Sequence, residues 1–210
     1  KNVIAALMVL AFFGMSGIPP VSGQKNVGSF DFAATLAERY DVIPNITYAT
    51  LGEWEGRLDV YQPYNAPAKT PTLVWIHGGG WTRSSKEQEL LYVMPYLEMG
   101  WAVVNVEYRL AARAKAPAAV EDCRCALRWV FANAEKYKFD LDRVVVSGIS
   151  AGGHLALMTS MLSPKDGFDR NCPDGTDPKV AAVVNWFGPS DVVDLIDGDN
   201  AFGQAIEWIG

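Results

Sequence analysis

Histidine and cysteine are scarce in this chain, and their scarcity narrows the chemistry open to it. The 210 residues include two histidines and three cysteines. A zinc site draws its ligands largely from these residue types at short, regular spacings, and no such spacing occurs here. We therefore expect no bound metal, and the sequence predicts no cofactor.

Excess positive charge and long apolar runs are also missing. The formal net charge is −6 and the isoelectric point is near 4.9. A nucleic-acid-binding protein presents a basic face to phosphates, so the charge argues against such a partner and favours a small neutral substrate. No run approaches the roughly 20 apolar residues that cross a bilayer. We expect no membrane span once the N-terminal segment is removed.

The longest apolar run is typical of a secretory signal. Lys1 precedes eleven apolar residues, Val3 to Phe13, and the small-residue segment GMSGIPPVSG follows them. This order predicts a signal peptide over residues 1–23, cleaved after Gly23, and a secreted or periplasmic protein. The alternative is a buried N-terminal helix. Because the chain begins with lysine and not methionine, we expect at least one residue before it.

The three cysteines leave the disulfide pattern open. Cys123 and Cys125 fall two apart on a predicted helix, so they point to different faces and do not bond each other easily. Cys172 lies in the polar loop RNCPDGTDP. An odd number means that one thiol is unpaired unless its partner lies outside this chain.

The remaining chain predicts one globular α/β domain. Half of the residues are hydrophobic and 20% are charged, which suits a chain that buries its own core. Alternation of strands and helices predicts a mostly parallel sheet covered on both faces. The expected strands are Ile46–Ala49, Leu58–Gln62, a strand entering His77, Trp101–Tyr108, Arg143–Ser147 and Val180–Phe187, the first two antiparallel.

Two helices are expected between these strands, over Lys86–Met99 and Ala118–Tyr137. In the second, helical spacing places four apolar residues on the buried face, namely Val120, Cys123, Leu127 and Val130. The same spacing places Arg124, Arg128 and Glu135 away from that face.

The segment RVVVSGISAGGH, residues 143–154, has the order of a nucleophile elbow. A β-branched strand runs into Gly148-Ile149-Ser150-Ala151-Gly152, and a helix follows. Gly148 and Gly152 leave room for a sharp turn that lifts the Ser150 hydroxyl clear of the sheet. The NH of Ala151 and the helix N-terminus then lie where negative charge collects on an attacked carbonyl. Ser150 is the candidate nucleophile.

A second motif supplies further backbone donors. The apolar strand in TLVWIHGGGW, residues 72–81, runs into His77 and three glycines, which matches the HGGG oxyanion loop of lipases and esterases. The predicted oxyanion hole consists of the NH groups of Gly79, Gly80 and Ala151. Trp81 either lines the pocket or belongs to the core.

Three segments, HGGGW, VEYRLAARAKAPAAVEDCRCALRWV and SGISAGGHLALM, resemble the hormone-sensitive-lipase-like and feruloyl-esterase-like (BD-FAE-like) branch of the α/β-hydrolases. The resemblance covers roughly Leu58 to Asp191 and departs from the commonest form at Ala111-Ala112 and at Ile149. It implies an α/β-hydrolase fold in which residues 24–210 are the N-terminal part of the domain, and a carboxylesterase acting on small acyl or aryl esters, including esters linked to plant polysaccharide. It also implies that His77 braces the glycine loop.

The sequence contains no obvious general base. In α/β-hydrolases the order is serine, then an acid, then a histidine, and no histidine follows His154. His154 is expected to be structural support, because Ser150 precedes the helix that carries His154. Asp191, in FGPSD, is the nearest downstream carboxylate; the resemblance makes that segment a structural turn, so Asp191 is a weak candidate for the acid.

We therefore expect a chain that ends before the acid and base, is nearly inactive by itself, and leaves Val180–Phe187 as an open apolar sheet edge. The leading hypothesis is a secreted serine hydrolase that cleaves carboxylic esters through an acyl-enzyme at Ser150. The alternatives are a non-catalytic ligand-binding protein on the same scaffold and a peptidase of the same fold.

Overall fold

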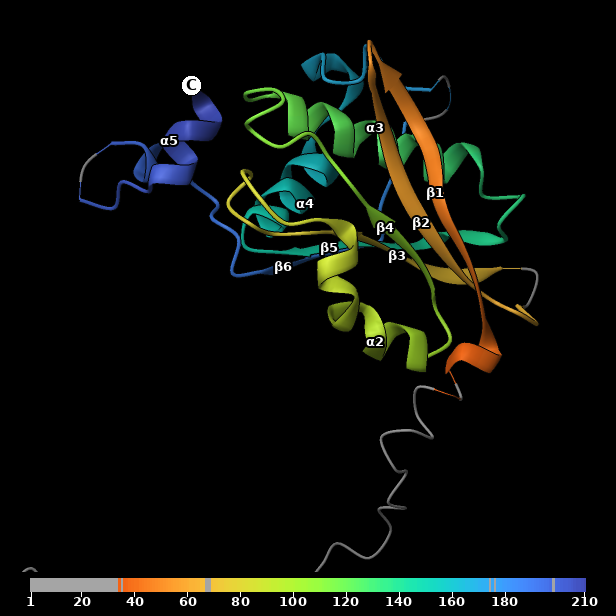
Figure 1. Cartoon of the computed structure of the whole chain (residues 1–210). Helices are drawn as coiled ribbons and strands as arrows, with labels where there is room; N and C mark the ends of the chain where they lie inside the picture. Colours follow the sequence, from red (N-terminus) through yellow and green to blue (C-terminus); the bar gives the residue numbers. More distant parts are fainter. Residues whose placement is uncertain (1–33, 35, 67–68, 174, 176, 198) are drawn as a thin grey trace, which may run out of the picture.

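The computed structural model describes residues 34–210 except for 35, 67–68, 174, 176 and 198 (Figure 1). The expected signal peptide, residues 1–23, lies outside the described residues. Within the described part of the chain, no helix has both the length and the apolar character that crossing a membrane requires.

The described strands form one six-stranded sheet. Its order is β1-β2-β4-β3-β5-β6, with β4 paired to β3, β3 to β5, and β5 to β6 in parallel. These four strands are β3 (Thr70–Ile76), β4 (Ala102–Val106), β5 (Phe139–Ile149) and β6 (Ala182–Trp186). The mostly parallel α/β architecture expected from the sequence is confirmed.

A long antiparallel hairpin leads the sheet. It consists of β1 (Tyr40–Leu51) and β2 (Trp54–Pro63), and β2 continues antiparallel to β4. Both strands are longer than the sequence predicts. Most of β1 is exposed at the sheet edge, and its exposed residues mix polar side chains with the apolar Val42 and Ile43, so the strand lacks the regular alternation by which strands are recognised.

Helices cover both faces of the sheet (Figure 1). Helix α2 (Leu90–Glu98) lies on one face, and α3 (Ala118–Ala132) and α4 (Ala151–Met161) lie on the other. The helix expected over Lys86–Met99 is divided: a 3-10 turn, η1 (Lys86–Glu89), precedes α2, and its Lys86 side chain is buried.

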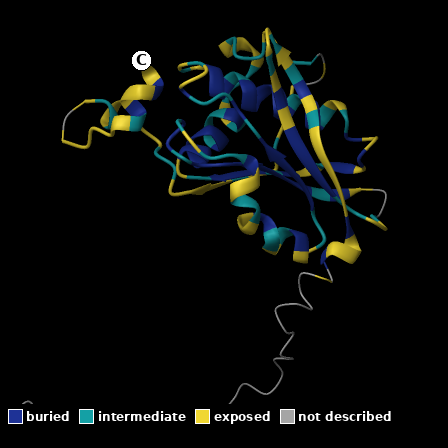
Figure 2. Ribbon diagram, viewed as in Figure 1, coloured by how far each residue is buried: buried dark blue, intermediate teal, exposed yellow. Residues whose placement is uncertain are grey.

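Two apolar clusters fill the space between the sheet and its helices. All five residues of β4 are buried, as expected for a strand covered on both faces (Figure 2). The larger cluster joins the sheet to α3 and α4, and the smaller one joins it to α2. This packing fixes the ends of β3 and β5 side by side.

Arg124, which helical spacing places away from the apolar face of α3, is nevertheless buried. Its side chain is only 1% exposed, and its Nε and Nη2 donate to Asp169 at 2.7 and 2.6 Å. Nη1 donates to the carbonyls of Thr159 and Leu162 at 2.9 and 2.8 Å. The loop after α4 folds back over α3, and helical periodicity within α3 carries no information about a loop 45 residues away.

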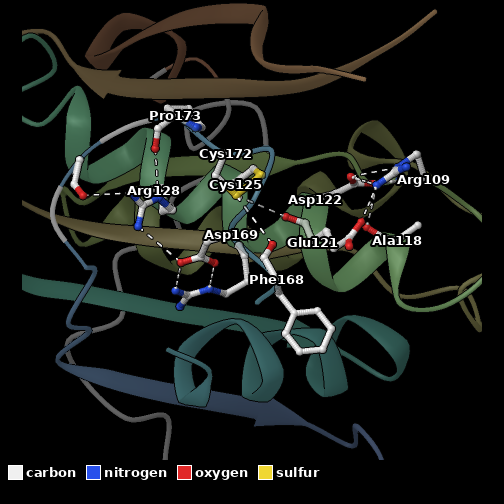
Figure 3. Close-up of a disulfide and its surroundings, with 12 residues drawn as sticks. Arg109, Ala118, Glu121, Asp122, Cys125, Arg128, Phe168, Asp169, Cys172 and Pro173 are labelled. Atoms are coloured by element: carbon white, nitrogen blue, oxygen red, sulfur yellow. Dashed lines mark hydrogen bonds and ion pairs between the residues drawn. A yellow bond between two sulfur atoms is a disulfide. The ribbon is translucent and has the colours of Figure 1, made fainter. Parts of the chain in front are cut away.

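A disulfide joins the same loop to α3. Cys125 on α3 is bonded to Cys172 (Figure 3). Cys123 is buried and free. Beside the disulfide, Arg128 donates to the carbonyl of Pro173 at 3.0 Å and lies 3.4 Å from Asp169. The bond therefore reinforces an attachment that the arginines also make.

The end of the chain forms a less buried layer beside β6. It contains the 3-10 turn η3 (Val193–Leu195) and helix α5 (Gly203–Ile209). A further 3-10 turn, η2 (Pro164–Asp166), lies earlier in the chain, in the loop between α4 and β6. Within the described residues nothing pairs with the outer edge of β6, where Val184 and Trp186 are 38% and 42% exposed. The open edge expected at this strand is present.

Candidate active site

Ser150 occupies the turn between β5 and α4. Its backbone has φ 55° and ψ −120°, and the residue is exposed. A non-glycine residue in this region of φ/ψ space costs on the order of 1–3 kcal/mol and persists only where its surroundings impose it. Here the Ser150 NH donates to the carbonyl of Trp186 at 2.7 Å, which ties the turn to the end of β6.

The glycines on either side of Ser150 are required by close backbone contacts. A Cβ on Gly148 would lie 2.4 Å from the carbonyl oxygen of Ile76, and one on Gly152 would lie 2.1 Å from the same atom. Both distances are far below van der Waals contact. The clearance predicted for Gly148 and Gly152 is therefore needed because β3 passes directly beside the turn.

The glycine-rich loop packs against the elbow backbone to backbone. A Cβ on Gly152 would lie 2.4 Å from the His77 oxygen, and one on Gly78 would lie 2.7 Å from the Ile149 oxygen. Gly79 and Gly80 have φ of 101° and 62°, a region that favours glycine. The two motifs, separated by about 70 residues in sequence, thus form one site.

The site contains backbone donors without protein acceptors. In the described chain, the NH groups of Gly79, Gly80 and Ala151 donate to no protein atom. Ala151 also begins α4, so the positive end of the helix dipole lies at Ser150. Unpaired donors near an exposed hydroxyl form an arrangement that is able to bind an anion.

A pocket of about 520 Å³ opens at Ser150. Its wall is largely apolar and is completed by the loop after β6 and the segment before α5. The lining residues are Gly80, Trp81, Ser150, Phe187, Pro189, Asp194, Leu195, Asn200, Ala201 and Phe202. A larger hollow of about 800 Å³ lies beside Trp54 and Arg109 and shares no lining residue with it.

Sequence reasoning missed Phe187 as a pocket residue. Phe187 is 85% exposed and has φ 56°, and the Asn185 side chain holds the turn by accepting from Gly188 N at 2.7 Å and donating to Gly188 O at 2.9 Å. The Asn-x-x-Gly spacing at the end of a strand was the available signal. Leu195 and Phe202 gave no comparable signal, because only the tertiary fold brings them to Ser150.

His77 lies behind the glycine loop. Its Nδ1 is 2.8 Å from the Gly78 oxygen, and its ring stacks on Tyr108 with centroids 4.2 Å apart. Its Nε2 lies 3.7 Å from Glu107 Oε1. The imidazole is fully buried among these groups, and its polar contacts are with the loop and with Glu107.

His154 lies in an aromatic environment on α4. Its ring is edge-on to Trp81 and Trp208, at centroid distances of 5.4 and 5.5 Å. Burial lowers the pKa of His154 to about 4, because charging the imidazole would cost hydration that nothing here replaces. Its backbone NH donates to the backbone carbonyl of Ser150 at 3.1 Å, as in a regular helical turn.

Asp191 is exposed and forms a local turn. Its Oδ1 accepts the NH of Val193 at 2.9 Å, and the residue is absent from the pocket lining. Trp81 has both roles that the sequence left open: it is 1% exposed and stacks on Trp208, yet it also lines the pocket. No group of three or more potential metal ligands gathers among the described residues.

The parallel sheet, the serine at the strand-to-helix turn and the glycine loop beside it define an α/β-hydrolase. The family model BD-FAE matches residues 58–210, and the chain belongs to that family.

Known proteins similar to this chain include several esterases. The chain is 32% identical to the esterase LipC of Mycobacterium tuberculosis over 136 residues, which are 64% of this chain and 34% of LipC. The bifunctional GH43-CE protein of Bacteroides eggerthii has a TM-score of 0.69 and 28% identity over 80% of this chain and 24% of its own. A truncated carbohydrate esterase from gut microbiota has a TM-score of 0.59 and 27% identity over 74% and 59%. The chain thus spans about a third of the length of the curated relative.

Proposed function

We propose that the protein containing this chain is a serine hydrolase of carboxylic esters. The observation that carries the proposal is the strained, exposed Ser150 beside three NH groups, those of Gly79, Gly80 and Ala151, that have no protein acceptor in the described chain. Acyl transfer requires a nucleophile and, at the same place, preorganised hydrogen-bond donors for the oxyanion.

The reaction proceeds through an acyl-enzyme. Ser150 Oγ attacks the acyl carbon, the oxyanion is held by the three NH groups, the alcohol leaves, and water then releases the acid. In the described chain neither His77 nor His154 presents its imidazole to Ser150, so neither is the general base that the mechanism requires. Loss of a triad histidine costs on the order of 10⁶ in kcat. We therefore expect these 210 residues alone to be nearly inactive.

The substrate is an ester whose acyl group is short-chain, acetyl or of the feruloyl (aryl) type. The largely apolar pocket of about 520 Å³ accommodates an acetyl or larger aryl group beside Phe187 and Phe202. Asp194 and Asn200, hydrogen-bonded to each other at 3.1 and 3.2 Å, add a polar rim. Together with the name of the carbohydrate esterase relative, this rim favours an ester of a hydroxyl-rich alcohol such as a carbohydrate.

The protein is exported to an oxidising compartment. The bond between Cys125 and Cys172 is of a kind that persists outside the reducing cytosol, and the signal-like residues 1–23 agree with export. N-terminal sequencing of the protein recovered outside the cytoplasm should begin at Gln24. Recovery of an uncleaved cytoplasmic protein would contradict export.

The test of function compares the full-length protein with its Ser150→Ala variant on a p-nitrophenyl short-chain ester. We expect turnover to fall by about 10⁶-fold, to the background left by the oxyanion donors and binding. Unchanged turnover in the variant would overturn the mechanism.

A ligand-binding protein without catalysis is the second candidate. It is favoured by the placement of both histidines, which leaves Ser150 without a base among these residues. Such a protein would show saturable binding of an ester with no release of its acid in the full-length form. Hydrolysis dependent on Ser150 excludes it.

A further inference from the structure

The first glycine of the loop, Gly78, has different partners from the two that follow it. Its NH donates to Glu89 Oε1 at 2.8 Å, and its carbonyl accepts from the Tyr108 hydroxyl at 3.1 Å. Because a trans peptide is planar, fixing the Gly78 carbonyl toward Tyr108 directs the Gly79 NH the opposite way. The peptides on both sides of Gly78 are thus held by side chains. Glu89 accepts from the NH of the first, and the carbonyl of the second lies 3.1 Å from the Tyr108 hydroxyl and 2.8 Å from His77 Nδ1. The Tyr108 hydroxyl also lies 3.1 Å from the His77 carbonyl of the first peptide.

The turn that carries Glu89 is itself anchored to the sheet. Lys86, three residues earlier in η1, donates from Nζ to Asp59 Oδ2 on β2 at 2.9 Å. Its carbonyl accepts from Asn105 Nδ2 on β4 at 2.7 Å, and its NH donates to Glu107 Oε2 at 2.9 Å. These three contacts hold in place the turn from which the Glu89 side chain extends.

Glu89 does not have the exposed position of a residue that serves only solubility. It is half-buried, and burial raises the pKa of its carboxyl group, while Oε2 is buried without a hydrogen-bond partner in the described chain. Leaving a buried acceptor unpaired costs about 1–3 kcal/mol. Its Oε1 accepts the hydrogen bond from Gly78, and the Trp75 side chain, whose Nε1 is likewise buried without another partner in the described chain, lies close enough to the carboxyl group to lower its pKa as the Gly78 NH does.

We propose that Glu89 is a positioning residue that holds the peptide before Gly78 so that the NH groups of Gly79 and Gly80 converge on the oxyanion formed at Ser150. This inference rests on the proposed esterase function. Glu89 would stabilise the transition state more than the bound ester, because the oxyanion exists only after Ser150 has attacked. A misplacement of about 1 Å at such a site costs on the order of a hundredfold in rate.

Two conservative variants of the full-length protein separate the effect of side-chain length at position 89 from the effect of its charge. Glu89→Gln keeps an acceptor oxygen at the same reach, and Glu89→Asp keeps the charge but is one methylene shorter. We expect Glu89→Gln to retain kcat within about threefold and Glu89→Asp to lose tenfold or more in kcat, with KM changed less than threefold in both. The inhibition constant of a phenylboronic acid, which mimics the oxyanion, should rise in parallel with the loss in kcat.

Glu87→Ala is the matched control. Glu87 lies on the same 3-10 turn, but its carboxylate is exposed and contacts Lys86, not the glycine loop. We expect this variant to keep kcat and boronate inhibition, and thermal unfolding of all variants is measured alongside. Wild-type kcat in Glu89→Asp, or equal losses in Glu89→Asp and Glu87→Ala, would overturn the inference. Assaying Ser150→Ala in the same series separates the two claims, since retained turnover there overturns the proposed function itself.

Discussion

Gly152 shows how little room the elbow leaves. Its α-carbon faces the carbonyls of Ile76 and His77, and a Cβ would approach them to 2.1 and 2.4 Å. Because both contacts are with backbone, no side-chain rotation relieves them. Residue identity at this position therefore follows from the approach of β3 to α4, and the sequence pattern already predicts that clearance without specifying which strand imposes it.

Replacement of Gly152 by alanine should be strongly destabilising. We expect Gly152→Ala to lower the free energy of unfolding by on the order of 3 kcal/mol, measured by urea denaturation, because β3 and α4 must separate. Gly203→Ala is the control: a Cβ there meets no atom within 4 Å, and alanine suits the first turn of α5. Similar unfolding midpoints for the two variants would contradict the close contact.

Burial of His154 makes stability depend on pH. The folded pKa, about 4, lies below the unfolded value of 6.5, so the unfolded chain binds the proton more readily. The stabilisation is fully present above about pH 6.5 and is lost as pH falls through about pH 4, a change of about 3 kcal/mol. His154→Gln should remove this dependence when unfolding is measured across that range. Parallel pH profiles of the two proteins would show that His154 is not the group responsible.

At the scale of elements, sequence periodicity predicts where strands and helices lie better than it predicts which distant segments they contact. The buried strand β4 and the nucleophile strand β5 were predicted because continuous β-branched runs suit a parallel sheet. Most of β1 was missed because an exposed edge strand has no such run. The burial of Arg124 was missed because its partner, Asp169, is brought to α3 only by the folding of a distant loop.

The disulfide should contribute substantially to that attachment. Cys125 and Cys172 close a loop with a sequence separation of 47, for which loop-closure entropy predicts about 4 kcal/mol. We expect the double variant Cys125→Ala/Cys172→Ala to lose stability of this order in urea denaturation. Non-reducing peptide mapping should recover the two cysteines linked and Cys123 alone. Recovery of a Cys123 linkage would contradict the pairing.

At the scale of the whole molecule, the fold and the two halves of the site were readable from sequence, whereas the pocket wall was not. The HGGG and GISAG motifs are recognisable from their glycines. Because they follow the ends of β3 and β5, which are adjacent and parallel, the two motifs lie at the same edge of the sheet. Phe187, Leu195 and Phe202 reach Ser150 through irregular segments, for which local patterns predict little.

The exposed edge of β6 should make the isolated 210 residues self-associate. Val184 and Trp186 present apolar surface beside backbone groups that are unpaired in the described chain. We expect oligomers in size-exclusion chromatography with light scattering, reduced by Val184→Lys on the strand. Val193→Lys, on an exposed apolar residue of η3, should leave association unchanged. A monomeric wild-type chain, or equal effects of both lysines, would contradict an edge-driven association.

The most direct measurement of the central claim is covalent trapping of the nucleophile. The full-length protein is treated with a p-nitrophenyl phosphonate, and its tryptic peptides are analysed by mass spectrometry. A serine activated beside an oxyanion site should release p-nitrophenolate stoichiometrically and carry the phosphonyl group on Ser150, within peptide 144–165. Ester hydrolysis that continues after treatment, with Ser150 unmodified or the adduct on another residue, would contradict the account.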